Sequence, residues 1–305
     1  MSSREHPVRA ATRFVVLAFV VAASATVMAQ WPKYTASGVP TGSDGKLDAN
    51  APTPRSADGH PDLSGVWEIT RDPNAPPPEP VGRAQGASSD GRGAQGPGRG
   101  RGQGGGSPFG NIGNNMPNQV APYQPWAADL VKKRMADNSK DNPDAHCLPM
   151  GIAQLNAHLY PRKIIQTPKE VLLIYEASGT TVREVFLDGR QLPKRDEVEP
   201  WYNGYSVGRW DGDTLVIQTT GFMDDGWLDV RGSPLTSGAT ITERFRRPKF
   251  GMLELEETID DPKAYTQPFT AKVFYRFSAD TQLIEFVCLD KDANHYVGNA
   301  AAAPK

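Results

Sequence analysis

Short β-prone segments recur at regular intervals through the second half of the chain, and this spacing limits the possible folds more than any other feature. Apolar and polar residues alternate within the segments, and most connections between them are short and contain Pro, Gly or Asp. This pattern is typical of antiparallel strands in a sandwich or barrel. We expect strands over residues 162–167, 171–177, 181–187, 205–210, 214–220, 239–246, 252–259, 269–277 and 282–290.

The strongest local signal is the pair Asp211-Gly212, which separates the β-prone runs 205–210 and 214–220. An Asp-Gly pair favours a type I′ turn, because both central residues of that turn need a positive φ and glycine adopts it without steric strain. We therefore expect a β-hairpin that turns at these two residues.

An earlier strand is expected within residues 61–70, where Gly65-Val66-Trp67 lies in a β-prone run. With it the chain has about ten strands, too many for a small open sheet with unprotected edges, so the sheet should close on itself. The Gly-x-Trp arrangement resembles the opening strand of lipocalin-like barrels, in which the Trp fills the closed end. The predicted fold is all-β, an antiparallel meander closed into a lipocalin-like barrel, in a single domain over residues 61–305.

Residues 1–29 have the composition of a cleavable signal peptide. Three arginines precede an apolar run over residues 14–23, and small residues end at Ala29. The alternative is an N-terminal membrane anchor, but a helical span needs about 20 apolar residues and this run is shorter. We expect a periplasmic or secreted protein with no integral membrane span after cleavage, and a poorly ordered polar arm over residues 30–60.

A Gly/Pro/Arg-rich insertion at about residues 73–118 cannot build a core and is expected to be disordered. Its arginines are not interleaved with aromatic residues, and the formal net charge of the chain is −2, so we do not expect nucleic acid as a partner. After the insertion, Pro125 is placed to open one short helix with cationic residues towards its end.

The chain has two cysteines, Cys147 and Cys288. In an exported protein we expect a disulfide between them rather than two free thiols. His146 and His158 lie near Cys147 in the sequence, but their spacing matches no standard zinc pattern, and the Asp-rich turns lack the spacing of an EF-hand. We therefore predict no metal and no cofactor.

Ionisable residues share the apolar faces of several expected strands. Alternation places Glu243, Glu257, Glu285 and Arg183 on the same faces as branched or aromatic side chains, and Tyr275 lies on another such face. If these faces line the barrel, they form a polar patch in an apolar lumen, as in small-molecule sites. Alternatively, the charged side chains face solvent, or a buried Arg-Glu pair only fixes the strand register.

The same patch would allow proton transfer. Burial raises the pKa of a carboxyl group and a neighbouring Arg lowers it, so one acid and one base can coexist in such a site. Glu243 and Glu285 are the candidates for moving a proton, and Arg183 or Arg244 would hold an anion.

Two longer connections interrupt the meander and carry aromatic residues. Trp201 lies in the connection 196–203, and Trp227 lies in the connection 222–238. Binding residues concentrate in such loops, so they are expected to form the mouth of the barrel, although they could equally just cover its open end. The candidate ligand-binding residues are Arg183, Tyr205, Arg244, Tyr275, Trp201 and Trp227.

Four motifs between about residues 147 and 295 resemble a family of uncharacterised secreted bacterial proteins: Asp188-Gly189-Arg190 and the runs 208–216, 242–246 and 258–262. The resemblance implies no activity. From the residues, we expect an exported barrel that binds a small, partly apolar ligand. The alternatives are an enzyme (a lyase, isomerase or hydrolase) that uses the same lumen, and an envelope structural or interaction module.

Overall fold

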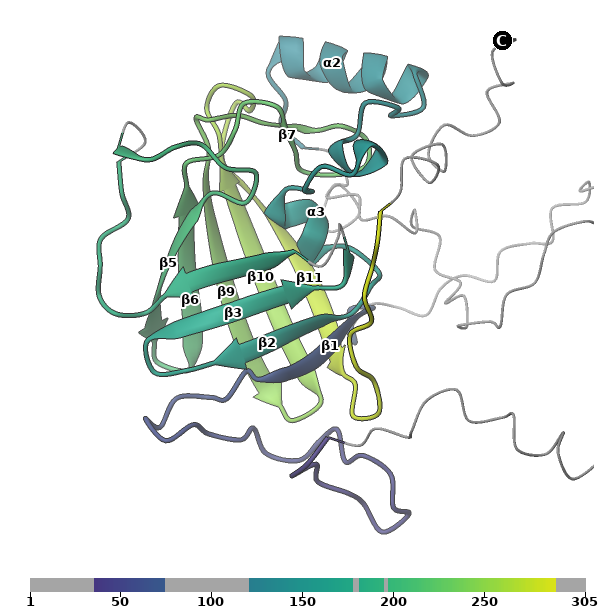
Figure 1. Ribbon diagram of the computed structural model, residues 1–305, viewed down its shortest axis with the longest axis vertical. Coiled ribbons are helices and arrows are strands. Elements are labelled where there is room, and N and C mark those ends of the chain that lie inside the picture. Colours follow the sequence, from purple (N-terminus) through teal and green to yellow (C-terminus); the bar gives the residue numbers. More distant parts are fainter. Residues whose placement is uncertain (1–35, 75–120, 178–180, 195–196, 289–305) are drawn as a thin grey trace, which may run out of the picture.

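A closed barrel of nine strands dominates the computed structural model, which describes residues 36–74, 121–177, 181–194 and 197–288 (Figure 1). The order of strands around the barrel is β1-β11-β10-β9-β6-β5-β4-β3-β2. The prediction of an all-β fold closed into a barrel is confirmed. The strands are β1 (Gly65–Thr70), β2 (Arg162–Gln166), β3 (Glu170–Tyr175), β4 (Val182–Phe186), β5 (Tyr205–Asp211), β6 (Thr214–Thr220), β9 (Thr240–Lys249), β10 (Met252–Asp260) and β11 (Phe269–Phe277).

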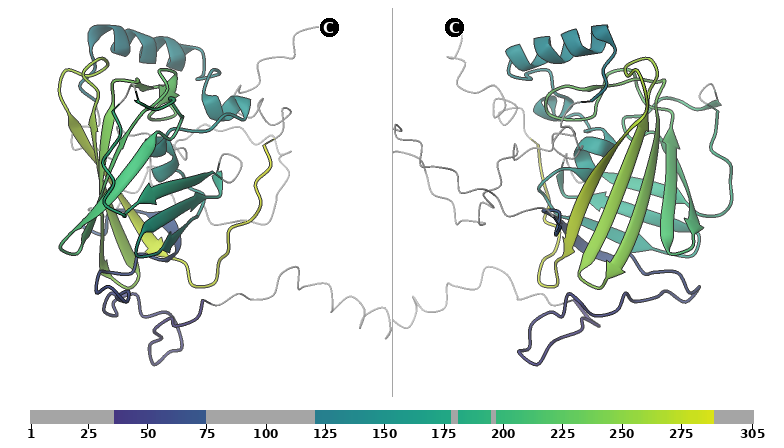
Figure 2. Two further views of the ribbon diagram at one scale, coloured as in Figure 1. Left: turned by 60° about the vertical axis from the view of Figure 1, so that its left-hand side comes forward. Right: turned by 180° about the vertical axis from the view of Figure 1, so that it is seen from behind.

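Smaller elements gather at one end of this barrel, which we call the upper end (Figures 1 and 2). They are the helix α2 (Pro125–Ala136), the 3-10 helix η2 (Pro143–His146), the short helix α3 (Ile152–Asn156), and the two-stranded pair β7 (Gly226–Trp227) and β8 (Pro234–Leu235). The helix expected from Pro125 is thus confirmed as α2. Its Trp126 donates a hydrogen bond to the carbonyl oxygen of Lys263, in the connection between β10 and β11.

Side-chain alternation along the strands agrees with the predicted faces. Residues 241, 243 and 245 of β9 are buried, as are residues 253, 255, 257 and 259 of β10. Two apolar clusters fill the inside. The lower cluster includes Trp67, Leu173, Phe245 and Leu255, and the upper cluster includes Ile152, Phe222, Ile241 and Ile259.

The hairpin between β5 and β6 forms with a different turn from the predicted one. Asp211 pairs with Thr214, so the central residues are Gly212 and Asp213. Gly212 has a φ of 58°, whereas Asp213 has no positive φ. A glycine with positive φ at the first central position alone is the pattern of a type II′ turn, so the prediction of type I′ was wrong in detail.

The predicted meander is interrupted at one place, because β4 and β5 run parallel. Their register covers only Val185 opposite Ser206 and Phe186 opposite Val207, the shortest pairing in the barrel. The connection 187–204 carries the chain back to the end of the barrel from which β4 started, so β5 enters in the same direction. The barrel is therefore mixed, because all the remaining pairs of neighbouring strands are antiparallel.

The last strand predicted from the sequence, over 282–290, was wrong. Residues 281–288 have no regular secondary structure, and 289–290 lie outside the described residues. The two edges of β11 already pair with β10 and β1, so no free edge remains beside it. The segment instead runs along the outside of the barrel, as Figure 1 shows.

The lower end is closed by Trp67 and by the polar arm. Gly65 of the Gly-x-Trp motif has a φ of 140°, and a Cβ there would lie 2.4 Å from the ring of Phe277, so the position requires glycine. The Trp67 Nε1 donates to the carbonyl oxygen of Leu63 at 2.9 Å. The guanidinium of Arg247 lies 4.9 Å from the Trp67 ring centroid. A bulky aromatic group and a cation thus fill this end.

The arm that was expected to be poorly ordered has defined contacts where it is described, over 36–60. Arg55 forms an ion pair with Asp213 at 2.7 Å, and His60 stacks on Trp210 with a centroid distance of 4.6 Å. The backbone amides of Phe250 and Gly251 donate to carbonyl oxygens of the arm. The arm therefore packs under the β5–β6 and β9–β10 turns. The predicted signal peptide and nearly all of the predicted Gly-rich insertion lie outside the described residues.

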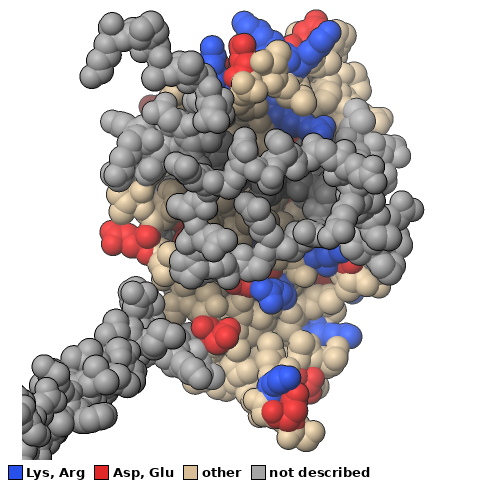
Figure 3. Space-filling model, turned by 90° about the vertical axis from the view of Figure 1, so that its right-hand side faces the viewer, with Lys and Arg blue, Asp and Glu red and all other residues tan. Residues whose placement is uncertain are grey.

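Cys147 and Cys288 form a disulfide, as predicted, with their Cα atoms 5.6 Å apart. Cys147 follows η2, so the bridge ties the upper part of the molecule to the segment after β11. Among the described residues, no helix combines the length and the apolar character that a membrane crossing requires. Lys, Arg, Asp and Glu side chains are interspersed on the face shown in Figure 3.

Candidate functional site

A layer of polar side chains lies inside the barrel between the two apolar clusters. On β9, Glu243 lies between Ile241 of the upper cluster and Phe245 of the lower one; on β10, Glu257 lies between Ile259 and Leu255. Glu243 and Glu257 are directly opposite each other in the sheet. Arg183, Asn156, Tyr175 and Tyr275 complete this layer, and all are buried. The structure thus brings together four of the five residues predicted as a patch: Arg183, Glu243, Glu257 and Tyr275.

The Arg183 guanidinium forms a two-pronged ion pair with Glu243. Its Nη1 donates to Glu243 Oε1 at 2.9 Å, and its Nη2 donates to Glu243 Oε2. Arg183 also donates to the hydroxyl oxygens of Ser206, at 3.1 Å, and Thr219, at 2.8 Å. Burial lowers the pKa of Arg183, but the Glu243 carboxylate outweighs it and raises that pKa. The pair is therefore charged, and its hydrogen bonds compensate part of the cost of burial.

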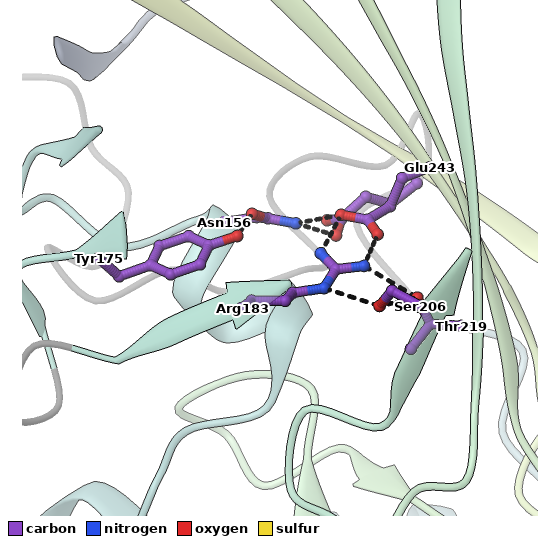
Figure 4. A network of polar contacts seen from close by, with 7 residues as sticks. Asn156, Tyr175, Arg183, Ser206, Thr219 and Glu243 are labelled. Carbon is purple, nitrogen blue, oxygen red and sulfur yellow. Dashed lines mark hydrogen bonds and ion pairs between the residues drawn. The ribbon is translucent and has the colours of Figure 1, made fainter. Parts of the chain in front are cut away.

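Asn156 enters this layer from α3 rather than from a strand. Its Nδ2 donates to Glu243 Oε1 at 2.8 Å and to Glu257 Oε1 at 2.6 Å, and its Oδ1 accepts from the hydroxyl of Tyr175 at 2.8 Å. Figure 4 shows the amide of Asn156 between Tyr175 and Glu243, with the Arg183 guanidinium between the carboxylate and the hydroxyls of Ser206 and Thr219. The amide therefore links the two carboxyl groups to the opposite wall of the barrel.

The surroundings of Glu257 favour its protonated form. Burial, and then the negative charge of Glu243, raise the pKa of Glu257 from 4.5 to about 8, while the bond from Asn156 acts in the opposite direction. Two carboxyl groups this close do not both ionise readily. The layer thus contains a carboxylic acid beside an ion-paired carboxylate, an arrangement that allows hydrogen bonding to donors and acceptors alike.

A second set of donors meets the backbone at Asn156. The Tyr275 hydroxyl donates to the Asn156 carbonyl oxygen at 2.8 Å, and Arg162 Nη1 donates to the same oxygen. Arg162 Nη2 donates to the carbonyl oxygen of His158 at 2.6 Å, and the guanidinium lies 4.4 Å from the Tyr275 ring centroid. Burial raises the pKa of Tyr275 well above its ordinary value and that of Tyr175 to about 12, so both phenols are donors.

The other residues predicted for the site lie elsewhere. Glu285 is exposed on the segment after β11, since no strand forms there to turn it inward. Tyr205 and Arg244 lie on the outer face, where Tyr205 accepts a hydrogen bond from Arg190, and Arg244 pairs with Asp211 at 3.1 Å. Both occupy positions next to an inward residue of their strand, so alternation turns them outward.

The two loop tryptophans differ in exposure. Trp201 is 60% exposed, whereas Trp227 is buried under the guanidinium of Arg134, which lies 4.3 Å from its ring centroid. Trp227 therefore helps to cover the upper end, which was the alternative considered for this loop. Within the described parts of the chain, neither tryptophan makes a hydrogen bond or a ring contact with the polar layer.

Two members of the layer, Tyr175 and Asn156, were missed in the sequence, and so was the neighbouring Arg162. Tyr175 shares the alternating inward face of β3 with Val171 and Leu173, so periodicity alone could have found it. Arg162 lies at the start of β2, where too few residues precede it to establish a face. Asn156 gave no signal, because it lies in a short helix whose five residues are all buried.

No group of three or more His, Cys, Asp or Glu side chains is placed to hold a metal ion within the described parts of the chain. His158 is buried, and burial and the nearby Arg162 charge lower its pKa to about 4. His146 is exposed, and its Nε2 lies 2.9 Å from the carbonyl oxygen of Lys140.

No protein-family model matches the chain, and a search of curated proteins finds no significant match.

Proposed function

We propose that the protein is an exported barrel that binds a small, partly apolar ligand in the upper half of its lumen. The polar layer is the observation that carries this proposal. Arg183, Glu243, Glu257, Tyr175 and Tyr275 converge from five strands on one region between apolar clusters. Small-molecule sites have the same composition, mostly apolar walls with a few convergent polar groups.

Export is supported by two independent features. The disulfide between Cys147 and Cys288 is of a kind that persists in oxidising compartments, and the sequence of residues 1–29 favours a signal peptide. The test is to express the full-length gene with its own leader and to determine the N-terminus and location of the mature protein. A chain that retains residues 1–29 in the cytoplasm would contradict this part of the proposal.

Binding is tested on the purified mature protein with a mixed panel of apolar and aromatic metabolites. Native mass spectrometry shows which compounds remain bound, and analysis of the solution shows which are consumed. We expect retention of at least one compound, and weaker retention in Glu257→Gln. Glu256→Gln is the matched control, because the neighbouring Glu256 faces outward and pairs with Lys272 at 2.6 Å.

An enzyme is the second candidate, favoured by the raised pKa of Glu257 next to the Glu243 carboxylate. A protonated acid beside a carboxylate is the combination that proton transfer needs. Consumption of a compound that is lost in both Glu257→Gln and Glu243→Gln would establish this alternative. Neither retention nor consumption of any compound would overturn both proposals and favour a structural or interaction module.

A further inference from the structure

We propose that Asn156 occupies the ligand site of the barrel, and that the ligand displaces α3 by presenting the same groups as Asn156: a primary amide next to a second carbonyl, on an apolar body. This inference rests on the function proposed above. It adds the chemical class of the ligand and the element that must move.

Asn156 is held as a bound ligand would be held. Its side-chain amide nitrogen, side-chain oxygen and backbone oxygen all bond to residues of barrel strands: Glu243, Glu257, Tyr175, Tyr275 and Arg162. α3 itself belongs to no sheet, and Figure 1 shows it at the upper end of the barrel. An element from outside the barrel thus satisfies the polar groups that converge in the lumen.

The bonds of Asn156 define the head group of the ligand. The ionised Glu243 requires an N–H donor, Glu257 Oε1 accepts from the same donor, and the Tyr175 hydroxyl requires an acceptor oxygen close to it. A primary amide supplies both from one planar group. A carboxylate in the same place would put an oxygen against the ionised Glu243, which is unfavourable because like charges repel. The hydroxyl of Tyr275 and the guanidinium of Arg162 add a need for a second carbonyl oxygen.

The remaining residues of α3 define the apolar body. Leu155 belongs to the lower apolar cluster and Ile152 to the upper one, and both are fully buried. Removing α3 from the barrel therefore exposes apolar walls to water. A ligand that replaces the helix must cover these walls, so an amide with no apolar body would not compete.

Two features of α3 make it the element that can leave. It has only five residues, and its N-cap, Gly151, provides no side-chain hydrogen bond. Among the described residues, Gln154 Oε1 and Arg162 Nε are buried without a hydrogen-bond partner. Unsatisfied buried polar atoms destabilise the state in which α3 is packed in the barrel. The Arg162 guanidinium thus has one donor left for a ligand that offers more acceptors than α3.

N-octanoylglycinamide is the probe that reproduces this pattern. Its two carbonyl carbons are joined through a nitrogen and Cα, and those of an asparagine residue are joined through Cα and Cβ, so their spacing is the same. The octanoyl chain provides the apolar body. N-octanoylglycine is the matched control, because it differs only in having a carboxylate in place of the amide.

The experiment is calorimetric titration of the mature protein with each probe at pH 7. We expect the amide to bind at least about tenfold more tightly than the acid, a difference equivalent to about 1.4 kcal/mol. Hydrogen exchange is measured in parallel, and bound amide should increase exchange in residues 152–157 while the barrel strands stay protected. Equal binding of the two probes, tighter binding of the acid, or binding with unchanged exchange of α3 would overturn the inference.

Variants distinguish a ligand that displaces α3 from one that binds to any apolar surface of the protein. Asn156→Ala removes the competing head group, so it should bind the amide more tightly than the wild type does. Tyr175→Phe keeps the ring and removes a donor that Asn156 and the bound amide use in turn. The variant should therefore reduce the advantage of the amide over the acid severalfold, because α3 is displaced more easily by a ligand that makes no use of this donor. Glu256→Gln should affect the binding of neither probe. If Asn156→Ala does not fold, the Tyr175→Phe result decides.

The experiments distinguish a failure of the proposed function from a failure of the present inference. If the metabolite panel yields a lumenal ligand but the amide shows no advantage over the acid, only the present inference is wrong. If no compound of the panel and neither probe binds, the proposed function is wrong as well.

Discussion

A carboxyl group held neutral inside a barrel makes stability depend on pH in a defined direction. In the unfolded chain Glu257 loses its proton near pH 4.5, whereas in the folded protein it keeps the proton to about pH 8. Its contribution to the free energy of unfolding is fully present below about pH 4.5 and is lost as the pH rises through about 8. The decrease is at most about 1.4 kcal/mol per pH unit.

Glu257→Gln removes this titration. Relative to the wild type, the variant should gain stability steadily as the pH is raised from 5 to 8, measured as the free energy of urea unfolding at each pH. Glu256→Gln is the control, and its difference from the wild type should not follow the same pH course. A constant difference between Glu257→Gln and the wild type would mean that Glu257 is ionised throughout this range.

Substitution of Gly212 measures the conformational energy that a positive φ costs a larger residue in the β5–β6 turn. Its φ is 58°, and a Cβ at this position would have no heavy atom within 4 Å, so a larger residue costs only conformational energy. Gly212→Ala should lower the free energy of unfolding by about 1–2 kcal/mol, and Gly212→Asn by less, because Asn tolerates positive φ better. Thermal unfolding of the two variants checks this order. Equal losses would indicate that the turn changes its conformation.

At the scale of elements, the disulfide fastens a segment that the barrel does not need for closure. Cys288 lies beyond β11, and the bridge closes a loop with a sequence separation of 141 residues. Cross-links of long loops stabilise mainly by restricting the unfolded chain. The variant with Cys147→Ser and Cys288→Ser should lose about 2–4 kcal/mol of stability in urea unfolding.

The same double variant should also show where the bridge acts. Hydrogen exchange should rise in residues 281–288 and around η2. In β10 and β11 the free energy of exchange should fall only by as much as the free energy of global unfolding. Loss of protection that begins in β11 would contradict the view that the barrel closes independently of the disulfide.

The sequence was informative about strands and less so about their partners. Alternation and turn residues located β2 to β6 and β9 to β11 within a few residues, because both signals are local. The parallel junction of β4 and β5 was not predictable, because it depends on the path of the connection 187–204. The false strand over 282–290 had suitable alternation, but strand formation also needs a free sheet edge, and periodicity carries no information about one.

The same limit applies to the site. Inward alternation identified Arg183, Glu243, Glu257 and Tyr275, which all come from regular strands. Asn156 could not be found, because its role depends on where a buried five-residue helix enters the barrel. Glu285 was misplaced for the converse reason, since a face was assigned to it in a strand that does not form.

For the whole molecule, the junction of β4 and β5 is the weakest point of the barrel wall, and the buried ion pair crosses it. Arg183 belongs to β4, and its partners Ser206, Thr219 and Glu243 belong to β5, β6 and β9. One side chain thus connects the two sides of the junction at which the backbone register is shortest. The pair therefore supports closure of the barrel where hydrogen bonds between the strands are fewest.

Breaking the pair should open this junction first. Glu243→Gln leaves the Arg183 guanidinium buried without its carboxylate and should lower stability by about 3–5 kcal/mol. Arg244→Gln, the next position on the same strand, removes only an exposed ion pair and should cost less than about 1 kcal/mol. Urea unfolding measures both.

In Glu243→Gln, hydrogen exchange should increase more in β4 and β5 than in β10 and β11. A uniform increase over all strands would contradict a special role of the ion pair at this junction.

The place of β1 in the barrel has a consequence for the newly made chain. β1 lies between β2 and β11, and Trp67 is opposite Phe277, so the N-terminal strand of the barrel cannot complete its pairing until the C-terminal one has been synthesised. At roughly 5 to 20 residues per second, that wait lasts on the order of ten seconds or more. During this time β1 keeps a bare backbone edge and an uncovered tryptophan, both of which promote association with other chains. Until β11 is available, the nascent chain of this protein is therefore more prone to association with other chains than the folded barrel is.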